Sequence, residues 1–355
     1  MVCGLNLPLR LIMLQATFKP YQLNFKKPVL TSRGEMTVKS GYFLTVTDGK
    51  NTGVGECSFI EGLSADDLSN YEEVLQTICT YLEKDEKPDS TIVSSHPSIV
   101  FGLECALLDL KNGGQKIFFE SAFTQGRKQI PINGLVWMGK KDFMQKQIEE
   151  KLASGFSCIK IKVGAIDFAE EVSLLRFIRK KFPADKIEIR LDANGAFDAT
   201  DVFKKLETLA AFQIHSIEQP VRRGQLELMM KVCRNSPIPV VLDEELIGVR
   251  GSVQDDVLSF TRPKYIILKP SLLGGFAVCD EWIRKAERQN IEWWATSALE
   301  SNIGLNAIAQ WVFTKKNKLV QGLGTGSLYT TNIASPLFIE KGCLGYNPKA
   351  QWGNL

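Results

Sequence analysis

Histidine is scarce in this chain, and its cysteines follow no pattern that would bind a metal ion or form a disulfide framework. The 355 residues include only two histidines, His96 and His215, which excludes a histidine-rich metal site. Eight cysteines are scattered singly, without any Cys-x-x-Cys pair. This distribution is typical of free thiols in a reducing compartment, so we expect a cytoplasmic protein without disulfides or structural zinc.

Long apolar runs and dense basic clusters are also missing. The segment 5–14 is apolar, but Pro8 and Arg10 interrupt it, and it is too short to cross a bilayer. Lysine and arginine number 43 against 40 aspartates and glutamates, which gives a net charge of only +3. No stretch concentrates this small excess, so we expect neither nucleic acid nor a membrane as a partner.

What the chain does have is an ionisable residue in or directly after each of five successive apolar runs. The runs are Ile159–Val163, Ile187–Leu191, Ile214–Ile217, Val240–Leu242 and Tyr265–Leu268. The charged residues are Lys160 and Lys162, Asp192, Glu218, Asp243 and Lys269. From Lys162 onward the intervals are 30, 26, 25 and 26 residues, the length of one strand, one helix and two loops. One such charge is usually a helix cap or a solvated loop residue, but five in register predict side chains that converge at one mouth.

The order of the expected elements predicts two domains and a terminal segment. Residues 1–125 combine strand and helix patterns and are expected to form an α+β capping domain. Residues 126–325 alternate eight strand-like runs with seven helical segments, which favours a (β/α)7β TIM-like barrel of the α/β class. No clear eighth helix follows Leu323, and residues 326–355 are expected to pack back on the capping domain. An open doubly wound sheet is the alternative.

Within the capping domain, the sequence predicts a hairpin followed by a helix. Gly41–Thr47 and Thr52–Cys57 read as paired strands around an Asp48-Gly49 turn. The glycine-rich Gly53–Glu56 lies inside this hairpin and does not lead into a helix, so it is a poor candidate for a phosphate-binding loop. The helix is expected to begin at Ser64, with an apolar stripe of Leu68, Tyr71, Leu75, Ile78 and Leu82.

The strand-end charges indicate a particular chemistry. Lys160 and Lys162 are two residues apart on one strand and therefore share a face, where repulsion should lower the pKa of at least one of them. Three carboxylates on the next three strands would repel one another without a cation, and oxygen ligands of this kind suit Mg²⁺. Lys269 would then face Lys162 across the ion. Such a site suits removal of a proton α to a carboxylate, with the metal stabilising the enediolate.

Five ordered motifs carry a resemblance to a known family. They are Lys160-Ile161-Lys162, Asp192-Ala193-Asn194, Glu218-Gln219-Pro220, Asp243-Glu244-Glu245 and Leu268-Lys269-Pro270. In order and approximate spacing they resemble the muconate-lactonizing branch of the enolase superfamily, and the resemblance extends over nearly the whole chain. The C-terminal stretches Thr296–Ser301 and Gly322–Thr330 look most like the o-succinylbenzoate synthase family of menaquinone biosynthesis.

The resemblance implies an activity and a role for each residue. It implies a lyase that dehydrates 2-succinyl-6-hydroxy-2,4-cyclohexadiene-1-carboxylate to 2-succinylbenzoate, acting on a small carboxylate with one Mg²⁺ or Mn²⁺ ion. Lys162 would remove the α-proton, and Lys269 would stabilise the enediolate. Asp192, Glu218 and Asp243 would hold the metal. Substrate-binding roles are implied for Lys160, Asn194, Ser297 and Arg33, with the loops Thr31–Gly34 and Glu56–Leu63 closing over the mouth.

Alternatives stay open at this point. An N-acylamino acid racemase or a dipeptide epimerase on the same scaffold would use Lys162 and Lys269 as opposed bases. Dipeptide epimerases typically carry Asp-x-Asp on the eighth strand, where this chain has Gly324-Thr325-Gly326. A non-catalytic barrel that binds a metabolite is a further alternative, although all five principal positions are intact. The sequence leaves a homo-oligomer open.

Overall fold

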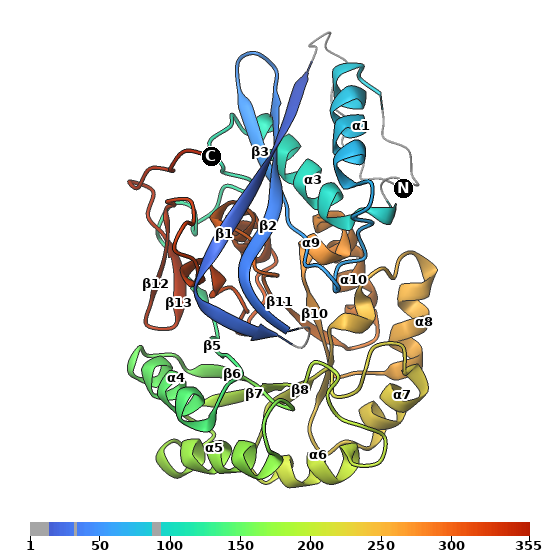
Figure 1. Cartoon of the computed structure of the whole chain (residues 1–355), viewed down its shortest axis with the longest axis vertical. Helices are drawn as coiled ribbons and strands as arrows, with labels where there is room; N and C mark the ends of the chain where they lie inside the picture. Colours follow the sequence, from blue (N-terminus) through green and yellow to red (C-terminus); the bar gives the residue numbers. More distant parts are fainter. Residues whose placement is uncertain (1–13, 32–33, 87–93) are drawn as a thin grey trace.

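The computed structural model describes residues 14–31, 34–86 and 94–355 (Figure 1). Within these ranges an antiparallel N-terminal sheet with two helices lies against a curled parallel sheet wrapped by helices. No helix in the described ranges has the length and hydrophobicity needed to span a bilayer.

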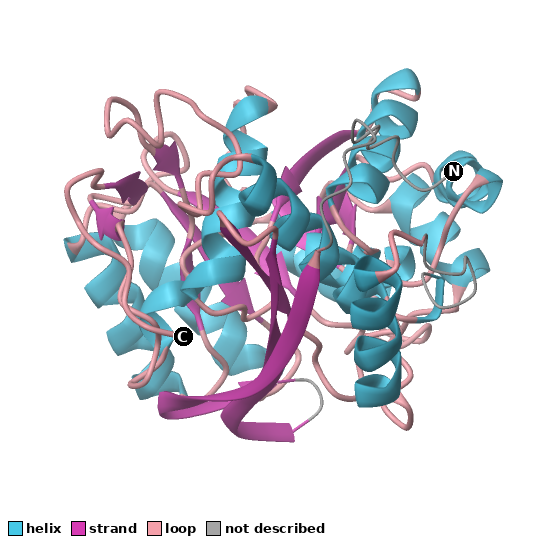
Figure 2. Cartoon of the chain, turned by 90° about the horizontal axis from the view of Figure 1, so that it is seen from above, coloured by secondary structure: helices cyan, strands magenta, loops and turns pink. Residues whose placement is uncertain are grey.

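The N-terminal part is a three-stranded antiparallel sheet covered by helices. Its elements are β1 (Gln15–Thr31), β2 (Gly34–Thr47), β3 (Thr52–Cys57), α1 (Tyr71–Glu83) and α3 (Pro97–Lys111), with strand order β1-β2-β3. The predicted β2–β3 hairpin is confirmed, and Asp48 closes its turn by accepting hydrogen bonds from the amides of Lys50 and Asn51. Figures 1 and 2 show β1 and β2 as a pair of long, curved strands.

The helix predicted from Ser64 begins later than expected. The Ser64 hydroxyl accepts a hydrogen bond from the Ile60 amide at 2.8 Å and so closes a turn instead of capping a helix. Asp67 bonds to the amide and hydroxyl of Ser69. The helix α1 therefore begins at Tyr71, and Leu68 is exposed. Short polar side chains commonly satisfy nearby backbone groups in this way and compete with helix formation.

The larger part alternates strands and helices as the sequence predicts. Its elements are β5 (Gly134–Val136), α4 (Lys141–Ala153), β6 (Cys158–Lys162), α5 (Phe168–Lys181), β7 (Glu188–Asp192), α6 (Val202–Ala210), β8 (Ser216–Glu218), α7 (Leu226–Asn235), β9 (Val240–Leu242), η1 (Glu244–Leu246), α8 (Ser252–Thr261), β10 (Tyr265–Leu268), α9 (Pro270–Leu273), α10 (Phe276–Arg288), β11 (Glu292–Ala295) and α11 (Asn302–Thr314). The strands β5 to β11 pair in parallel and in chain order, which confirms the α/β class and rules out a doubly wound order.

A short extended segment joins the two edges of this seven-stranded sheet. Gln321 forms a parallel bridge with Ile132, and Gly322 forms one with Thr296. The Gln321 amide donates to the Pro131 carbonyl at 2.9 Å, and the Gly322 amide donates to the Ala295 carbonyl at 2.8 Å. These residues occupy the position of the predicted eighth strand. From Gly322 the chain continues directly into the short 3₁₀ helix η2 (Thr325–Leu328), with no α-helix between the strand position and η2.

The C-terminal segment contacts both larger parts. The strands β12 (Leu337–Glu340) and β13 (Cys343–Tyr346) form a small sheet with β4 (Ile130–Pro131), which leads into the barrel. Tyr329 bridges Phe25 of β1, and the Thr330 amide donates to the Asn24 carbonyl at 2.8 Å. These two residues contact the N-terminal sheet; the domain boundaries at 125 and 325 and the packing of residues 326–355 on the capping domain stay predictions.

The glycine-rich stretch of β3 serves packing. A Cβ atom at Gly53 would lie 2.1 Å from the Ala106 carbonyl oxygen, and one at Gly55 would lie 1.8 Å from that of Gly102. Both carbonyls belong to α3, so only glycine lets this helix lie directly on the strand. The close approach positions the next residue, Glu56, against the barrel.

Glu56 fixes the N-terminal sheet to a barrel helix. Its side chain is fully buried and accepts hydrogen bonds from the amides of Ser301 and Gly304, each at 2.8 Å, at the start of α11. The hydroxyls of Ser301 and Tyr21 also donate to it. A carboxylate is favoured at a helix N-terminus, because the free amide groups there carry partial positive charge. This contact holds the loop before α11, which forms one wall of the cavity described below.

Replacing Glu56 by glutamine should therefore destabilise the fold. The new amide NH₂ would face donors in a buried site, so we expect a loss of about 3 kcal/mol in the free energy of unfolding. Urea unfolding of the purified variant measures it. The matched control is Glu72→Gln, because Glu72 is exposed and its side chain accepts a hydrogen bond from the Tyr42 hydroxyl at the surface. Equal stability of the two variants would show that the Glu56 contact does not hold the two parts together.

Candidate active site

The predicted site residues lie side by side at the carboxyl ends of neighbouring strands. Lys162 at the end of β6 is in register with Asp192 on β7, which is in register with Glu218 on β8. Asp243 follows β9 and Lys269 follows β10. All three carboxylates are at most 2% exposed. Parallel strands bring their ends to one edge of the sheet, and the expected convergence at one mouth is therefore what the structure shows.

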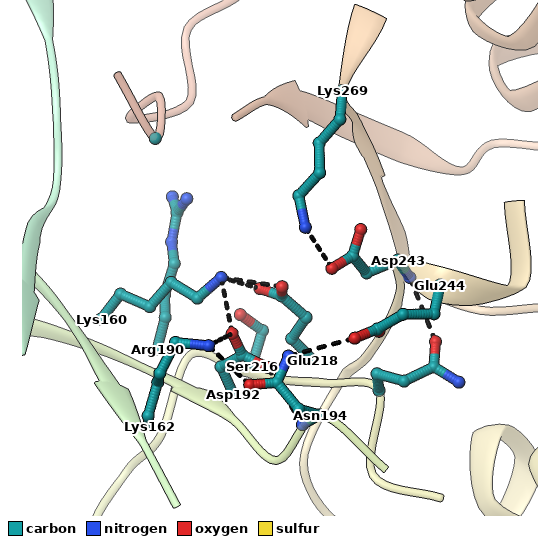
Figure 3. A network of polar contacts seen from close by, with 12 residues as sticks. Lys160, Lys162, Arg190, Asp192, Asn194, Ser216, Glu218, Asp243, Glu244 and Lys269 are labelled. Atoms are coloured by element: carbon teal, nitrogen blue, oxygen red, sulfur yellow. Dashed lines mark hydrogen bonds and ion pairs between the residues drawn. The ribbon is translucent and has the colours of Figure 1, made fainter. Parts of the chain in front are cut away.

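Lysine ammonium groups lie between the carboxylates, as Figure 3 shows. The Lys160 Nζ atom lies 2.9 Å from Asp192 Oδ2 and 2.6 Å from Glu218 Oε2. Lys162 approaches Asp192 Oδ2 at 3.4 Å, and Lys269 forms an ion pair with Asp243 from the other side. The two lysines predicted to oppose each other thus reach the carboxylates from β6 and from the end of β10, with three strands between them.

Charge crowding sets the protonation of this cluster. Burial and the neighbouring Asp192 raise the pKa of Glu218 well above its usual range. Burial would also raise the pKa of Asp192, but the ammonium groups of Lys160, Lys162 and Lys269 hold it well below its usual range. Burial would lower the pKa of Lys160, yet the carboxylates around it raise that pKa above its ordinary value. For Lys160 this is the opposite of the expected effect, because attraction by three carboxylates outweighs repulsion by one lysine.

Asn194 and Trp137 fix the position of Lys162. The Lys162 Nζ atom donates to Asn194 Oδ1 at 2.6 Å and lies 5.9 Å from the centre of the Trp137 ring. Asn194 has a positive φ of 44°, and its own amide donates to Asp192 Oδ1 at 3.1 Å. A short polar side chain tolerates this left-handed backbone better than most. The resemblance implies a substrate-binding role for Asn194, and in the structure its side chain contacts the proposed base.

Glu244 is a site residue to which the sequence analysis gave no role, although it lies within one of the quoted motifs. Its Oε1 atom accepts from the Asn194 side chain at 3.1 Å, while its buried Oε2 atom has no hydrogen-bond partner within the described part of the chain. Burial, followed by the charge of Asp243, raises the pKa of Glu244 to about 7. Its position directly after Asp243 was the signal that could have identified it.

The carboxylates fit a hard divalent cation in their chemistry, although their present contacts are to lysines. Among the described residues, no three carboxylate, histidine or cysteine side chains are grouped so that they could hold an ion as they stand. Four acidic side chains nevertheless lie close together, with one buried oxygen of Glu244 unpartnered among the described residues and the Glu218 pKa raised by burial and by the neighbouring Asp192. A bound cation would lower the Glu218 pKa and could give the unpartnered oxygen a partner. A set of ligands made only of oxygen atoms suits Mg²⁺ or Mn²⁺.

The remaining predicted residues differ in where they lie. Ser297 lines the same cavity of about 120 Å³ as Lys162 and Lys269, and its hydroxyl lies 2.6 Å from that of Thr325. Ser297 follows β11 and Thr325 follows the position of the eighth strand, so this contact joins the last two strand ends. Ile60 and Leu63, from the loop predicted to close the mouth, also line the cavity. Arg33 lies outside the described residues.

Comparison with known proteins places the chain in a family. The family described as "Enolase C-terminal domain-like" matches residues 143–349, and "MenC, N-terminal domain" matches residues 13–110. An o-succinylbenzoate synthase from Desulfotalea psychrophila is 44% identical over 94% of this chain and 99% of its own length.

Solved structures agree with the sequence matches. The crystal structure of MenC from Desulfotalea psychrophila LSv54 superposes with a TM-score of 0.84 at 41% identity, covering 94% of this chain and 99% of the other. A substrate-liganded L-Ala-D/L-Glu epimerase from Bacillus subtilis shares the fold, with a TM-score of 0.80 at 20% identity over 94% of this chain and 95% of the other. The chain therefore belongs to the enolase superfamily and, within it, to the o-succinylbenzoate synthase family of lyases.

Proposed function

We propose that this chain dehydrates 2-succinyl-6-hydroxy-2,4-cyclohexadiene-1-carboxylate to 2-succinylbenzoate, in the cytoplasm. The observation that carries the proposal is the placement of Lys162 and Lys269 on either side of three buried carboxylates. The 44% identity to a relative named o-succinylbenzoate synthase supports the choice of substrate. The reaction removes one proton and one hydroxide from adjacent ring carbons, which leaves an aromatic ring and requires no oxidant.

Lys162 is the proposed acid–base residue. In its neutral form the amine takes the proton from the carbon next to the substrate carboxylate, and the resulting ammonium group then protonates the departing hydroxyl, which leaves as water. Asn194 and Trp137 hold its Nζ atom in place for both transfers. The Lys269 ammonium group stabilises the negative charge that develops on the carboxylate. The proton thus moves from carbon to nitrogen to oxygen.

Asp192, Glu218 and Asp243 are the proposed ligands of Mg²⁺. When bound, the ion supplies positive charge beside the substrate carboxylate, which lowers the cost of removing the α-proton. Lys160 holds Asp192 and Glu218 together through contacts of 2.9 and 2.6 Å. Its proposed role is to set the charge around Lys162 and the carboxylates.

The same lysine pair also suits racemisation of an N-acylamino acid, in which one lysine removes the α-proton and the other returns one on the opposite face. Dipeptide epimerisation is less well supported. Gly324 and Thr325, which directly follow the position of the eighth strand, line the cavity and offer no carboxylate there to hold the ammonium group of a dipeptide.

We expect the purified protein to consume the cyclohexadiene substrate rapidly when Mg²⁺ is present. Loss of the diene absorbance measures the rate, and excess EDTA should abolish it. If a folded, Mg²⁺-loaded sample leaves the diene unchanged, the proposed reaction is wrong. Exchange of the α-proton in D₂O, measured for N-acylamino acids and for dipeptides, then decides between the two alternatives.

A further inference from the structure

A fully buried glutamate, Glu300, directly follows the residues Ala298 and Leu299, which form part of the wall of the catalytic cavity. Its Oε1 atom accepts a hydrogen bond from the Ser271 hydroxyl at 2.5 Å, and its Oε2 atom accepts one from the Ala298 amide at 2.7 Å. Burying a carboxylate costs free energy unless its partners compensate for the lost water. The two contacts join the segment that follows β10 to the segment that follows β11.

The segment that follows β10 carries Lys269. The ladder between β10 and β11 ends at Leu268, whose carbonyl accepts a hydrogen bond from the Thr296 amide at 3.0 Å. Lys269 is the first residue past this ladder, and the short helix α9 begins directly after it. The amides of the last two residues of α9 donate to the Lys269 carbonyl at 2.9 and 3.0 Å. Ser271 lies within α9, so its contact with Glu300 helps to place the Lys269 backbone.

The segment that follows β11 has a strained backbone. Leu299 has a positive φ of 65°, which a residue with such a side chain rarely adopts because its Cβ atom approaches the following carbonyl oxygen. Such a conformation persists only where the surrounding contacts fix it. Here Glu300 holds the preceding amide, that of Ala298, and the Tyr329 hydroxyl donates to the Leu299 carbonyl at 2.7 Å. The cavity wall is therefore held in one form by its neighbours.

Glu300 is also fixed at the start of α11. A Cβ atom at Gly304 would lie 2.9 Å from the Cβ atom of Glu300 and 2.9 Å from Glu56 Oε2, so both glutamates pack against this glycine. Burial raises the pKa of Glu300 to about 7, and the hydrogen bond from Ser271 opposes that shift. The carboxylate of Glu300 thus has little freedom to move, and it can act as a rigid link between α9 and the cavity wall.

We propose that Glu300 is a positioning residue for Lys269: it fixes the turn after Lys269 to the cavity wall, so that the ammonium group is in place before the substrate binds. This inference rests on the proposed function, because it assumes that Lys269 stabilises charge that develops during the reaction. A group of that kind is most effective when it is held in place in advance, since it does not have to reorganise as the charge forms. Loss of the link should therefore lower the turnover number and leave substrate binding unchanged.

The test removes the link from either end. Ser271→Ala removes only the hydroxyl, and Glu300→Met removes both acceptor oxygens at a similar side-chain length. We expect Ser271→Ala to lower kcat about ten-fold in the diene assay with KM and Mg²⁺ affinity unchanged, because a small misplacement of a catalytic group has effects of this size. Glu300→Met should lose at least as much. The double variant should have the kcat of Glu300→Met, since the link is already lost there.

A conservative variant and a matched control complete the comparison. Glu300→Gln should restore most of the activity, because its carbonyl oxygen can accept from the Ala298 amide while its NH₂ group donates to the Ser271 hydroxyl. The control is Glu104→Met. Glu104 is a half-buried glutamate that accepts hydrogen bonds from the first two amides of α10, and it is not among the described residues that line the catalytic cavity. That variant should unfold at lower urea concentration and keep its kcat.

Hydrogen exchange provides a measurement that does not depend on turnover. In Ser271→Ala, the amides of Leu272 and Leu273 in α9 should exchange about ten-fold faster, while the amides of α10 exchange as in the unmodified protein. Unchanged exchange at these two amides would overturn the inference, because the packing of α3 against α9 would then suffice to hold the turn.

The kinetic outcomes separate this inference from the proposed function. An unchanged kcat in Ser271→Ala would overturn the inference, and this variant decides alone if Glu300→Met does not fold. An equal loss of kcat in Glu104→Met would also overturn it, because the effect would then be one of general stability. If the unmodified protein does not dehydrate its substrate, the proposed function is wrong, and hydrogen exchange still decides whether Glu300 fixes the turn after Lys269.

Discussion

Replacing Lys162 by alanine should lower the turnover number about ten-thousand-fold while leaving the fold and Mg²⁺ affinity nearly unchanged. General acid–base groups typically contribute 10²- to 10⁴-fold, and Lys162 is proposed to act in both proton transfers. Its side chain is only 12% exposed and its Nζ atom is held by Asn194 at 2.6 Å, so no neighbouring amine can take its place without rearrangement. Diene absorbance measures turnover, and calorimetry measures Mg²⁺ binding.

The control for this variant is Lys181→Ala, which removes a lysine from the surface of α5, where it pairs loosely with Glu149 at 3.8 Å. That variant should retain full activity. A Lys162→Ala enzyme that keeps a tenth or more of the turnover would reject Lys162 as the base. Lys269 would then be the first residue to examine, since it reaches the carboxylates from the other side.

Replacing Asp243 by asparagine should weaken Mg²⁺ binding about a hundred-fold or more and reduce turnover in parallel at limiting Mg²⁺. The change removes one of three proposed carboxylate ligands, and even residues that only support a ligand usually contribute 10- to 100-fold in metal affinity. It also leaves the Lys269 ammonium group without its present ion-pair partner. Calorimetric titration with Mg²⁺ gives the affinity directly.

Asp201→Asn is the matched control, because Asp201 is a surface aspartate directly before α6 and pairs at 2.7 Å with Lys205 of that helix. Its Mg²⁺ affinity should equal that of the unmodified protein. Undiminished Mg²⁺ affinity in Asp243→Asn would exclude Asp243 as a ligand. The two carboxylates joined by Lys160, together with Glu244, would then be the remaining candidates.

The barrel and the centre of its site could be predicted from the sequence because both follow from local repetition. Each buried strand is a short apolar run, and a charge at its end, repeated every 25 to 30 residues, places Lys162, Asp192 and Glu218 in register. The number of residues between successive strands can be counted in the sequence itself. Parallel pairing then makes residues distant in sequence neighbours in space.

Contacts that depend on which of several possible partners a side chain meets were not predictable in this way. The start of α1 at Tyr71 depended on which backbone groups Ser64 and Asp67 satisfied. The raised pKa of Lys160 depended on how many carboxylates surround it, and a single strand gives no sign of that number.

The sequence by itself thus determined the fold class, the order of the strands and the residues at the mouth, because periodicity and side-chain type are local properties. Only the tertiary structure decided that Glu56 caps α11 and that Asn194 orients Lys162. It also decided that Glu300 joins the turn after Lys269 to the wall of the catalytic cavity. These features arise from packing between segments, where distance and burial set the energy of each contact, and neither can be read from the order of residues.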